Sequence, residues 1–255
     1  MTRYGYPLLA LVRREVRKRY ATTMLGSAWT ILQPLALMVI YVVVFAVILR
    51  SGREADSARD FAFYLLAGML PYLAIAEGLQ RATTALREDR ALLEREIFPA
   101  EVLPVARVVV ASVAEVVGLV LLVILGIALG MSASGWILAL PLLVILRIVI
   151  TCGLAWIVSI LTIFVADLAE ALTFLLTAWL FLTPIFYPAD AVPPALQWMM
   201  VANPLHHLVE AYRSVLIAGR APFPEAFLLL AWAAAFAGAG LWFFRKALDR
   251  AKDHL

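Results

Sequence analysis

The chain of 255 residues is 64% hydrophobic, and only 15% of its residues are charged. A soluble domain is closer to half apolar and a quarter charged, so the composition excludes an ordinary water-soluble protein. The net charge of +3 does not indicate nucleic-acid binding, because the Lys and Arg residues flank apolar blocks and form no separate basic segment. We therefore expect an all-α, multi-pass integral membrane protein.

Residues 1–24 have the pattern of an amphipathic helix that lies along a membrane surface. Apolar and basic side chains recur at helical spacing, and the basic run directly precedes the first long apolar block. A simple positive anchor and a helix that also orients a cytoplasmic partner both explain this segment. We expect lipid to cover Leu8, Leu9, Leu11, Val12 and Val16, and headgroups to meet Arg13, Arg14, Arg17, Lys18 and Arg19, next to Tyr20.

The remaining apolar blocks predict six transmembrane helices, since a span takes about 20 residues. Fifteen of the 21 Lys and Arg residues fall on one side of these spans, five on the other and one inside a span. This bias places both termini in the cytoplasm, because cytoplasmic loops carry the excess of Lys and Arg. Residues 1–255 are expected to form a single transmembrane domain. The expected spans are Trp29–Leu49, Phe61–Gln80, Val105–Gly130, Gly135–Val165, Ala171–Tyr187 and Ala226–Phe244.

Segment 81–104, between the second and third spans, contains the densest run of charges in the chain and includes the apolar step Ile97-Phe98-Pro99. A mixed-charge helix that ends in such a step suits docking into a groove on another protein. A solvated loop helix is the alternative, but it would leave Ile97 and Phe98 exposed beside water. We therefore expect a docking segment on the cytoplasmic side.

Three charged residues, Glu77, Glu115 and Arg147, fall inside the predicted spans, where charge is costly. Glu77 lies near the inner end of its span and is expected to reach the membrane interface. Glu115 and Arg147 lie about 18 and 14 residues from the turn of a predicted hairpin, so at 1.5 Å per residue their depths differ by about 6 Å. This spacing predicts a buried ion pair between spans three and four, either as a fastener for the hairpin or as a polar position on a transport path.

Residues 188–222, between the fifth and sixth spans, are rich in proline yet stay apolar, unlike a solvated loop. Pro193-Pro194 suits the start of one short helix, and Asn203-Pro204 suits the start of another, with Asn at the N-cap and Pro at the first helical position. We expect two short amphipathic helices that dip back into the outer leaflet as an outer gate. The expected gate residues are Tyr187, Pro193, Pro194, Trp198, Asn203, Pro204, His206, Glu210 and Arg213.

The sequence predicts neither a catalytic site nor a metal site. His206, His207 and Glu210 have the spacing of metal ligands on a helix, but no further His or Cys supports them, so a polar face with a local Glu–Arg or His–Glu contact is the better explanation. The sequence contains no Gly-x-x-x-x-Gly-Lys-Ser/Thr loop and no His-Glu-x-x-His motif. We therefore expect that any reaction that powers the protein takes place on another chain.

Several motifs occur in a fixed order along nearly the whole chain. They are Arg14-Glu15-Val-Arg-Lys-Arg-Tyr20, Leu25-Gly26-Ser-Ala-Trp29 with Pro34, Tyr41-x-x-x-Phe45, Phe98-Pro99-Ala-Glu-Val-Leu-Pro104, Thr183-Pro184-Ile-Phe-Tyr187-Pro188 and Asn203-Pro204. In this order the chain resembles the membrane subunit, or permease, of ABC-2-type polysaccharide exporters, which export O-antigen, capsule or teichoic acid. The resemblance implies a protein of the bacterial cytoplasmic (inner) membrane that moves lipid-linked polysaccharide as a homodimer with two copies of a separate ATPase.

The resemblance also implies roles for single segments. ATP and Mg²⁺ would bind to the ATPase, and this chain would hold no cofactor. Residues 193–217 would form paired gate helices, and the sugar chain would pass through a channel on the dimer axis. The expected channel residues are Tyr41, Phe45, Phe174, Trp179 and Phe181. The expected residues for coupling to the ATPase are Arg87, Asp89, Arg90, Glu94, Ile97, Phe98 and Asp167.

One step departs from the family pattern. Ala166 stands where an Arg is expected before Asp167, so this inner loop is expected to contact the ATPase less strongly or in a different arrangement. An exporter of small amphiphiles, such as drugs or haem, is the alternative function. A membrane enzyme that acts on lipid-linked sugar is a more distant one.

Overall fold

The computed structural model describes residues 4–20, 25–41, 43–44, 55–93, 98–131 and 134–254. Within these ranges every regular element is a helix, in agreement with the all-α prediction. The helices are α1 (Gly5–Tyr20), α2 (Trp29–Tyr41), α3 (Ala55–Ala82), α4 (Ala85–Glu88), α5 (Arg90–Leu93), α6 (Val102–Ala128), α7 (Leu140–Phe164), α8 (Leu168–Leu182), α9 (Gln197–Val201), α10 (Pro204–Leu216) and α11 (Phe223–Lys252).

Four helical stretches are long and apolar enough to cross a membrane. They are Arg59–Ala82 in α3, Val102–Ala128, Gly135–Phe164 and Phe223–Lys252. The first and fifth predicted spans correspond to the shorter apolar helices α2 and α8. Residues 45–49 of the first predicted span lie outside the described residues, and the chain leaves the helical conformation after Leu182 in the fifth. A total of six spans therefore stays a prediction.

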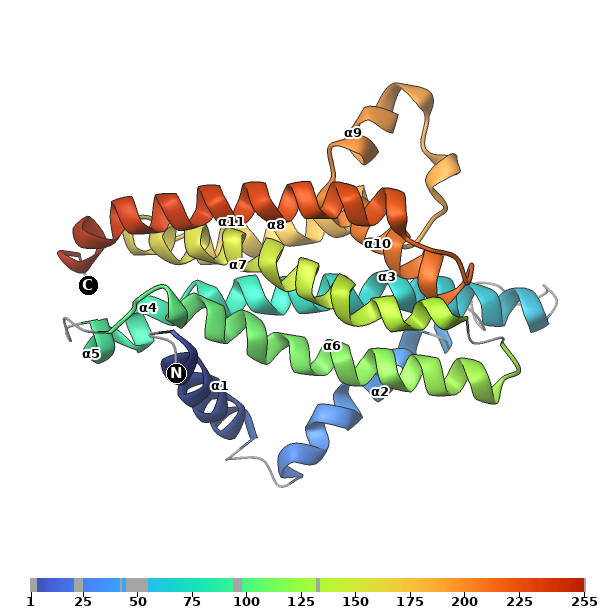
Figure 1. The fold of residues 1–255 in the computed structure, drawn as a ribbon, viewed down its shortest axis with the longest axis horizontal. Helices are drawn as coiled ribbons and strands as arrows, with labels where there is room; N and C mark the ends of the chain where they lie inside the picture. The colour runs from blue at the N-terminus through green and yellow to red at the C-terminus, as the bar shows by residue number, and fades with distance from the viewer. Residues whose placement is uncertain are drawn as a thin grey trace.

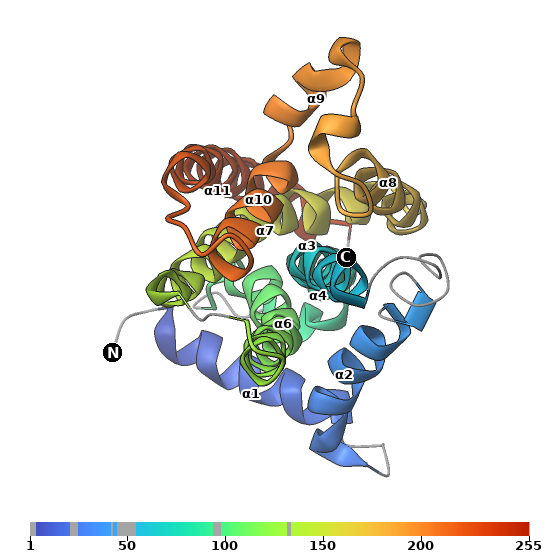
Figure 2. The ribbon, with the colours of Figure 1, turned by 90° about the vertical axis from the view of Figure 1, so that its right-hand side faces the viewer.

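The long helices run side by side along the long axis of the molecule (Figure 1). Helices α3, α6 and α7 enclose the larger apolar core, and α11 packs along α7 (Figure 2). Helices α1, α4 and α5 and the last turn of α11 lie toward one end of this bundle, whereas the turn between α6 and α7 lies at the other (Figure 1). The topology predicted from the Lys and Arg distribution would place the first of these ends on the cytoplasmic side.

The turn between α6 and α7 follows from its local sequence. Gly130 has a φ of 81°, in the left-handed region that side chains other than hydrogen disfavour. The hydroxyl of Ser134 accepts a hydrogen bond from the Trp136 N–H at 3.3 Å and donates one to the Gly219 carbonyl at 2.9 Å. These contacts tie the hairpin turn to the loop after α10.

Helices α7 and α11 approach each other through two glycines. A Cβ atom on Gly153 would overlap the backbone carbonyl of Phe236, and a Cβ atom on Gly240 would overlap the carbonyl of Gly153. Small residues allow helix backbones in a membrane to come this close and to gain packing contacts that lipid does not offer. Because the backbones of α7 and α11 are in direct contact here, a rotamer change cannot make room for a larger side chain.

Gly153→Ala and Gly240→Ala are each expected to destabilise the protein by about 1–3 kcal/mol, because the added methyl group must push two helix backbones apart. Gly238→Ala, in the helix of Gly240, is the matched control, since among the described residues no atom beyond the helix's own nearby backbone lies within 4 Å of a Cβ built there. Thermal unfolding of the detergent-solubilised protein measures the effect. Equal melting temperatures for the three variants would contradict the close contact.

The apolar face of α1 packs on the protein itself. Leu11 is buried in a second apolar cluster with side chains of α4, α5, α6 and α11, and Leu8 and Val12 pack against this cluster. The expectation that lipid covers these three residues is therefore wrong. The first turns of α6 and the last turns of α11 offer an apolar surface that competes with lipid for these side chains. Leu9, at 46% exposure, lies outside this cluster.

Candidate functional site

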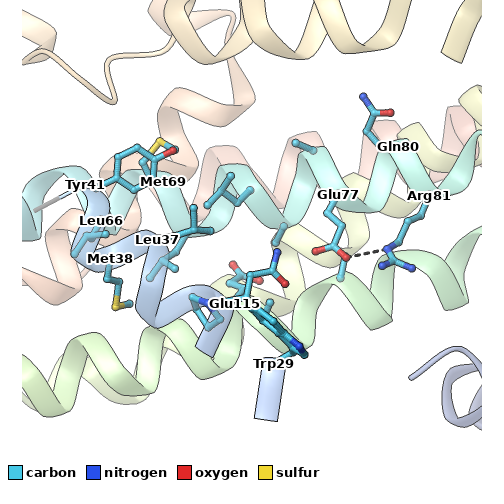
Figure 3. Close-up of a pocket in the computed structure, with 18 of the residues that line it drawn as sticks. Trp29, Leu37, Met38, Tyr41, Leu66, Met69, Glu77, Gln80, Arg81 and Glu115 are labelled. Atoms are coloured by element: carbon cyan, nitrogen blue, oxygen red, sulfur yellow. Dashed lines mark hydrogen bonds and ion pairs between the residues drawn. The ribbon is translucent and has the colours of Figure 1, made fainter. Parts of the chain in front are cut away.

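An open cavity of about 690 Å³ lies between α2, α3 and α6. Apolar side chains form most of its wall, among them Leu66 and Met69 of α3 (Figure 3). Tyr41 and Arg81 lie toward opposite ends of the cavity, and Glu115 reaches it from α6 (Figure 3). The cavity is therefore largely apolar, with a group of charged side chains at the Arg81 end and Glu115 between the two ends.

Glu77 of α3 organises the charged end of the cavity. Its Oε1 atom lies 2.8 Å from Arg19 Nη1 and 2.8 Å from Arg81 Nε. Arg19 also donates a hydrogen bond to Gln33 Oε1 at 3.2 Å, which ties the last turn of α1 to α2. Two guanidinium groups around one carboxylate leave this group of side chains with a net positive charge.

The charged residues predicted inside the third and fourth spans lie together in the bundle. Arg147 Nη2 pairs with Glu115 Oε2, and both side chains have 0% exposure. The other carboxylate oxygen of Glu115 accepts a hydrogen bond from the Tyr212 hydroxyl at 2.7 Å. The Tyr212 hydroxyl therefore joins α10 to the pair between α6 and α7.

Replacing Arg147 by Met is expected to destabilise the protein by about 3–5 kcal/mol, because the change strands the buried Glu115 carboxylate. Glu115→Gln is expected to cost a similar amount by stranding the guanidinium. The double variant should lose less unfolding free energy than the two single variants lose in sum. Reversible unfolding in mixed micelles measures all three, and additive losses would show that the two groups do not interact.

Tyr212→Phe removes one hydroxyl and is expected to cost about 1.5–3 kcal/mol, because the acceptor is charged. Tyr72→Phe is the matched control: the Tyr72 hydroxyl is also buried, but it donates to the neutral carbonyl of Leu176 at 3.1 Å. That loss should be nearer to about 0.5–1.5 kcal/mol. The same unfolding measurement compares them, and a Tyr72 variant as unstable as the Tyr212 variant would argue against an ionised Glu115.

Helix α10 begins and packs as a fixed element. Asn203 is its N-cap: the side-chain oxygen accepts hydrogen bonds from the Leu205 N–H at 3.0 Å and from Trp179 Nε1 at 2.8 Å. The Asn203 amide donates to Thr183 Oγ1 at 2.9 Å. The predicted helix start at Asn203-Pro204 is confirmed. The predicted start at Pro193-Pro194 is confirmed as well, as a 3₁₀ turn that leads into α9.

Arg213, one of the expected gate residues, is an internal anchor of α10. It donates to the Pro184 and Ile185 carbonyls at 2.7 and 3.0 Å and pairs with Glu210 at 2.9 Å. Its guanidinium carbon also lies 3.4 Å from the centre of the Tyr64 ring. With only 4% exposure, Arg213 holds α10 against α3 and the chain after α8. His206, on the same predicted polar face, is half-buried.

A second group of ion pairs, which sequence reasoning missed, surrounds Arg107 at the start of α6. Arg107 pairs with Glu15 of α1, with Glu88 Oε2 at 2.9 Å and with Asp89 Oδ2 at 3.0 Å. Arg14 pairs with Asp89 too. Burial alone disfavours the charge of Arg14, but Asp89 and Glu15 outweigh this effect and raise its pKa. The sequence signal for these ion pairs is Glu15, the one carboxylate within the basic run of α1.

The predicted coupling residues differ in their surroundings. Asp89 is buried in these ion pairs, whereas Arg87 and Arg90 are exposed, although Arg87 also donates to the Thr162 carbonyl at 2.6 Å. Phe98 is half-buried and packs against the second apolar cluster, so the expectation that it lies exposed unless a partner covers it is wrong. Glu94 and Ile97 lie outside the described residues. Asp167 is exposed at the start of α8.

The predicted channel aromatics do not gather around one cavity within the described chain. Tyr41 lines the main cavity, while Phe174 and Phe181 of α8 are 78% and 61% exposed. Trp179 is half-buried beside a smaller apolar cavity of about 390 Å³, which Trp198 and Phe236 also line. Phe45 and the side chain of Tyr20 lie outside the described residues.

The helical fold, the paired charges within it and the open cavity define a multi-pass membrane permease. The chain matches the family described as ABC-2 type transporter over residues 6–217 and therefore belongs to this family. Members of this family are transport permeases and not enzymes, and their ATPase is a separate subunit. The bacterial inner membrane fits this assignment.

Named relatives of the chain are export proteins. It is 31% identical to the O-antigen export system permease protein RfbA of Myxococcus xanthus over 226 residues, which cover 88% of this chain and 85% of the relative. An RfbA protein of Klebsiella pneumoniae is 24% identical over 213 residues, 83% of this chain and 80% of the relative. The polysialic acid transport protein KpsM of Escherichia coli is 27% identical over 212 residues, 82% of this chain and 81% of the relative.

Proposed function

We propose that this chain is the transmembrane subunit of an ATP-driven exporter that moves lipid-linked polysaccharide of the O-antigen or capsule type across the inner membrane. The observation that carries the proposal is the cavity between α2, α3 and α6. Its apolar wall suits the lipid part of such a substrate, and the cationic group at Arg19 and Arg81 suits a phosphate linkage. The similarity to O-antigen and polysialic acid transport proteins supports a glycan as the cargo.

We infer that the chain works as a homodimer with the channel on the dimer axis. Support comes from large apolar side chains that a single copy leaves uncovered: Phe174 on α8 and Trp198 on α9, at 78% and 67% exposure. Helix α9 projects sideways from the bundle in both views (Figures 1 and 2). A second copy would cover these surfaces and bring the α8 aromatics of two chains toward one path.

Two copies of an ATPase subunit are proposed to dock at the end of the bundle that carries α4 and α5. Arg87, Arg90 and Asp167 supply exposed charges there. The loop before α8 lies beside the end of α11, since the Phe164 and His254 rings are 5.4 Å apart. The ion pairs of Arg107 connect this docking end to α1 and α6, so a displacement by the ATPase would reach the cavity wall.

Co-purification of the chain with an ABC ATPase, followed by ATP hydrolysis assays in nanodiscs, tests this function. Native lipid-linked polysaccharide is expected to raise the hydrolysis rate several-fold over lipid alone. Stimulation by small amphiphiles and not by any lipid-linked glycan would favour the alternative exporter. Turnover of lipid-linked sugar by the permease without the ATPase would overturn the assignment altogether.

Tyr41→Ala is expected to lower glycan export several-fold, because it removes the ring at one end of the cavity, whereas Tyr41→Phe keeps the ring and should retain export. Phe227→Ala is the control, since Phe227 is 78% exposed on α11, a helix that contributes no residue to the described lining of the cavity. Polysaccharide on the cell surface is measured at matched permease levels. Export by the Tyr41→Ala variant at the wild-type rate would remove Tyr41 from the proposed path.

A further inference from the structure

The outward face of α1 carries a basic groove that lies apart from the main cavity. The groove has a volume of about 460 Å³, and its lining consists of Ala10 and four cationic residues, Arg13, Arg14, Arg17 and Lys18. Arg13 and Arg17 are exposed, and no ion pair joins either of them to a carboxylate in the described part of the chain. Their charge is therefore available to a ligand.

The carboxylate nearest in sequence does not neutralise this groove. Glu15 is the one acidic residue in α1, and its side chain, 5% exposed, pairs inward with Arg107. Lys18 lies 3.7 Å from Glu15 but keeps 57% exposure. Arg14 pairs with Asp89, yet its buried Nε has no hydrogen-bond partner among the described residues. The groove combines a net positive charge with N–H donors that the protein leaves unused.

The position of α1 identifies what lies opposite the groove. The helix lies across the flank of the bundle, with α6 on its inner side (Figure 2). It also lies nearer the middle of the bundle than α4 and α5 do (Figure 1). Tyr6 and Leu9, on the turn before the groove, are 66% and 46% exposed. Exposed aromatic, apolar and cationic side chains on the flank of a membrane protein are typical of the headgroup region.

We propose that this groove binds the phosphate group of an anionic phospholipid. The guanidinium groups of Arg13 and Arg17 donate paired N–H groups to phosphate oxygens, and Ala10 has no long side chain to keep the phosphate from the helix. Tyr6 and Leu9 contact the lipid next to the headgroup. The inference depends on the membrane location of the chain and not on the exported substrate, so it can fail or hold independently of the proposed function.

Native mass spectrometry of the purified permease, from nanodiscs with equal amounts of phosphatidylglycerol and phosphatidylcholine, tests the proposal. The wild type is expected to retain phosphatidylglycerol preferentially. Removing two cations in Arg13→Gln/Arg17→Gln should lower the relative affinity roughly 25-fold, at about fivefold for each charge. The matched control is Arg250→Gln/Lys252→Gln, which removes two exposed cations from the same end of the bundle and should leave the preference unchanged.

Three results would overturn the proposal. Equal retention of both lipids by the wild type would exclude a preference for anionic headgroups. Displacement of bound phosphatidylglycerol by millimolar inorganic phosphate would identify a general phosphate site. If the Arg13→Gln/Arg17→Gln variant kept its phosphatidylglycerol but no longer co-purified with the ATPase, the groove would be a protein-docking surface. Melting temperatures of both double variants are compared with the wild type, so that misfolding is recognised separately.

Discussion

A carboxylate in the interior of a membrane protein stays ionised only if a cation and hydrogen-bond donors surround it. Glu115 meets this condition through Arg147 on one oxygen and Tyr212 on the other. The three side chains come from α6, α7 and α10, so one carboxylate determines how the central hairpin and the last short helix fit together. Glu115 also lines the cavity, which places this junction directly beside the space assigned to the substrate.

The other buried charges repeat this arrangement at other levels of the bundle. Glu77 holds the end of α1 against α3, and Arg107 joins α1, the α4–α5 segment and α6. Electrostatic contacts thus connect helices whose apolar faces alone would allow several registers, since apolar packing has little directionality. In contrast, α7 and α11 are joined by close backbone packing at Gly153 and Gly240.

Features that depend on local spacing could be predicted from the sequence. The hairpin turn allowed depth to be counted along two adjacent helices, so Glu115 and Arg147 were matched, and Asn203-Pro204 identified the start of α10. Tyr212 and Glu115 are 97 residues apart, and Arg107 and Glu15 are 92 apart, so no periodic pattern connects them. The apolar face of α1 was assigned to lipid because lipid and a protein surface impose the same hydrophobic pattern on a helix.

Tyr212 and Arg213 are neighbours in α10 but bind different parts of the protein. Tyr212 donates a hydrogen bond to Glu115, and Arg213 donates to the carbonyls after α8. Consecutive residues on an α-helix point about 100° apart, so these two contacts define the angle of α10 about its own axis. Rotation of the helix about its axis would break both contacts at once, although Glu115 would keep Arg147 and Arg213 would keep Glu210. If the outer gate opens, α10 is therefore expected to move together with Glu115 and with the chain after α8, because any movement of α10 alone would break the contacts of these two adjacent side chains.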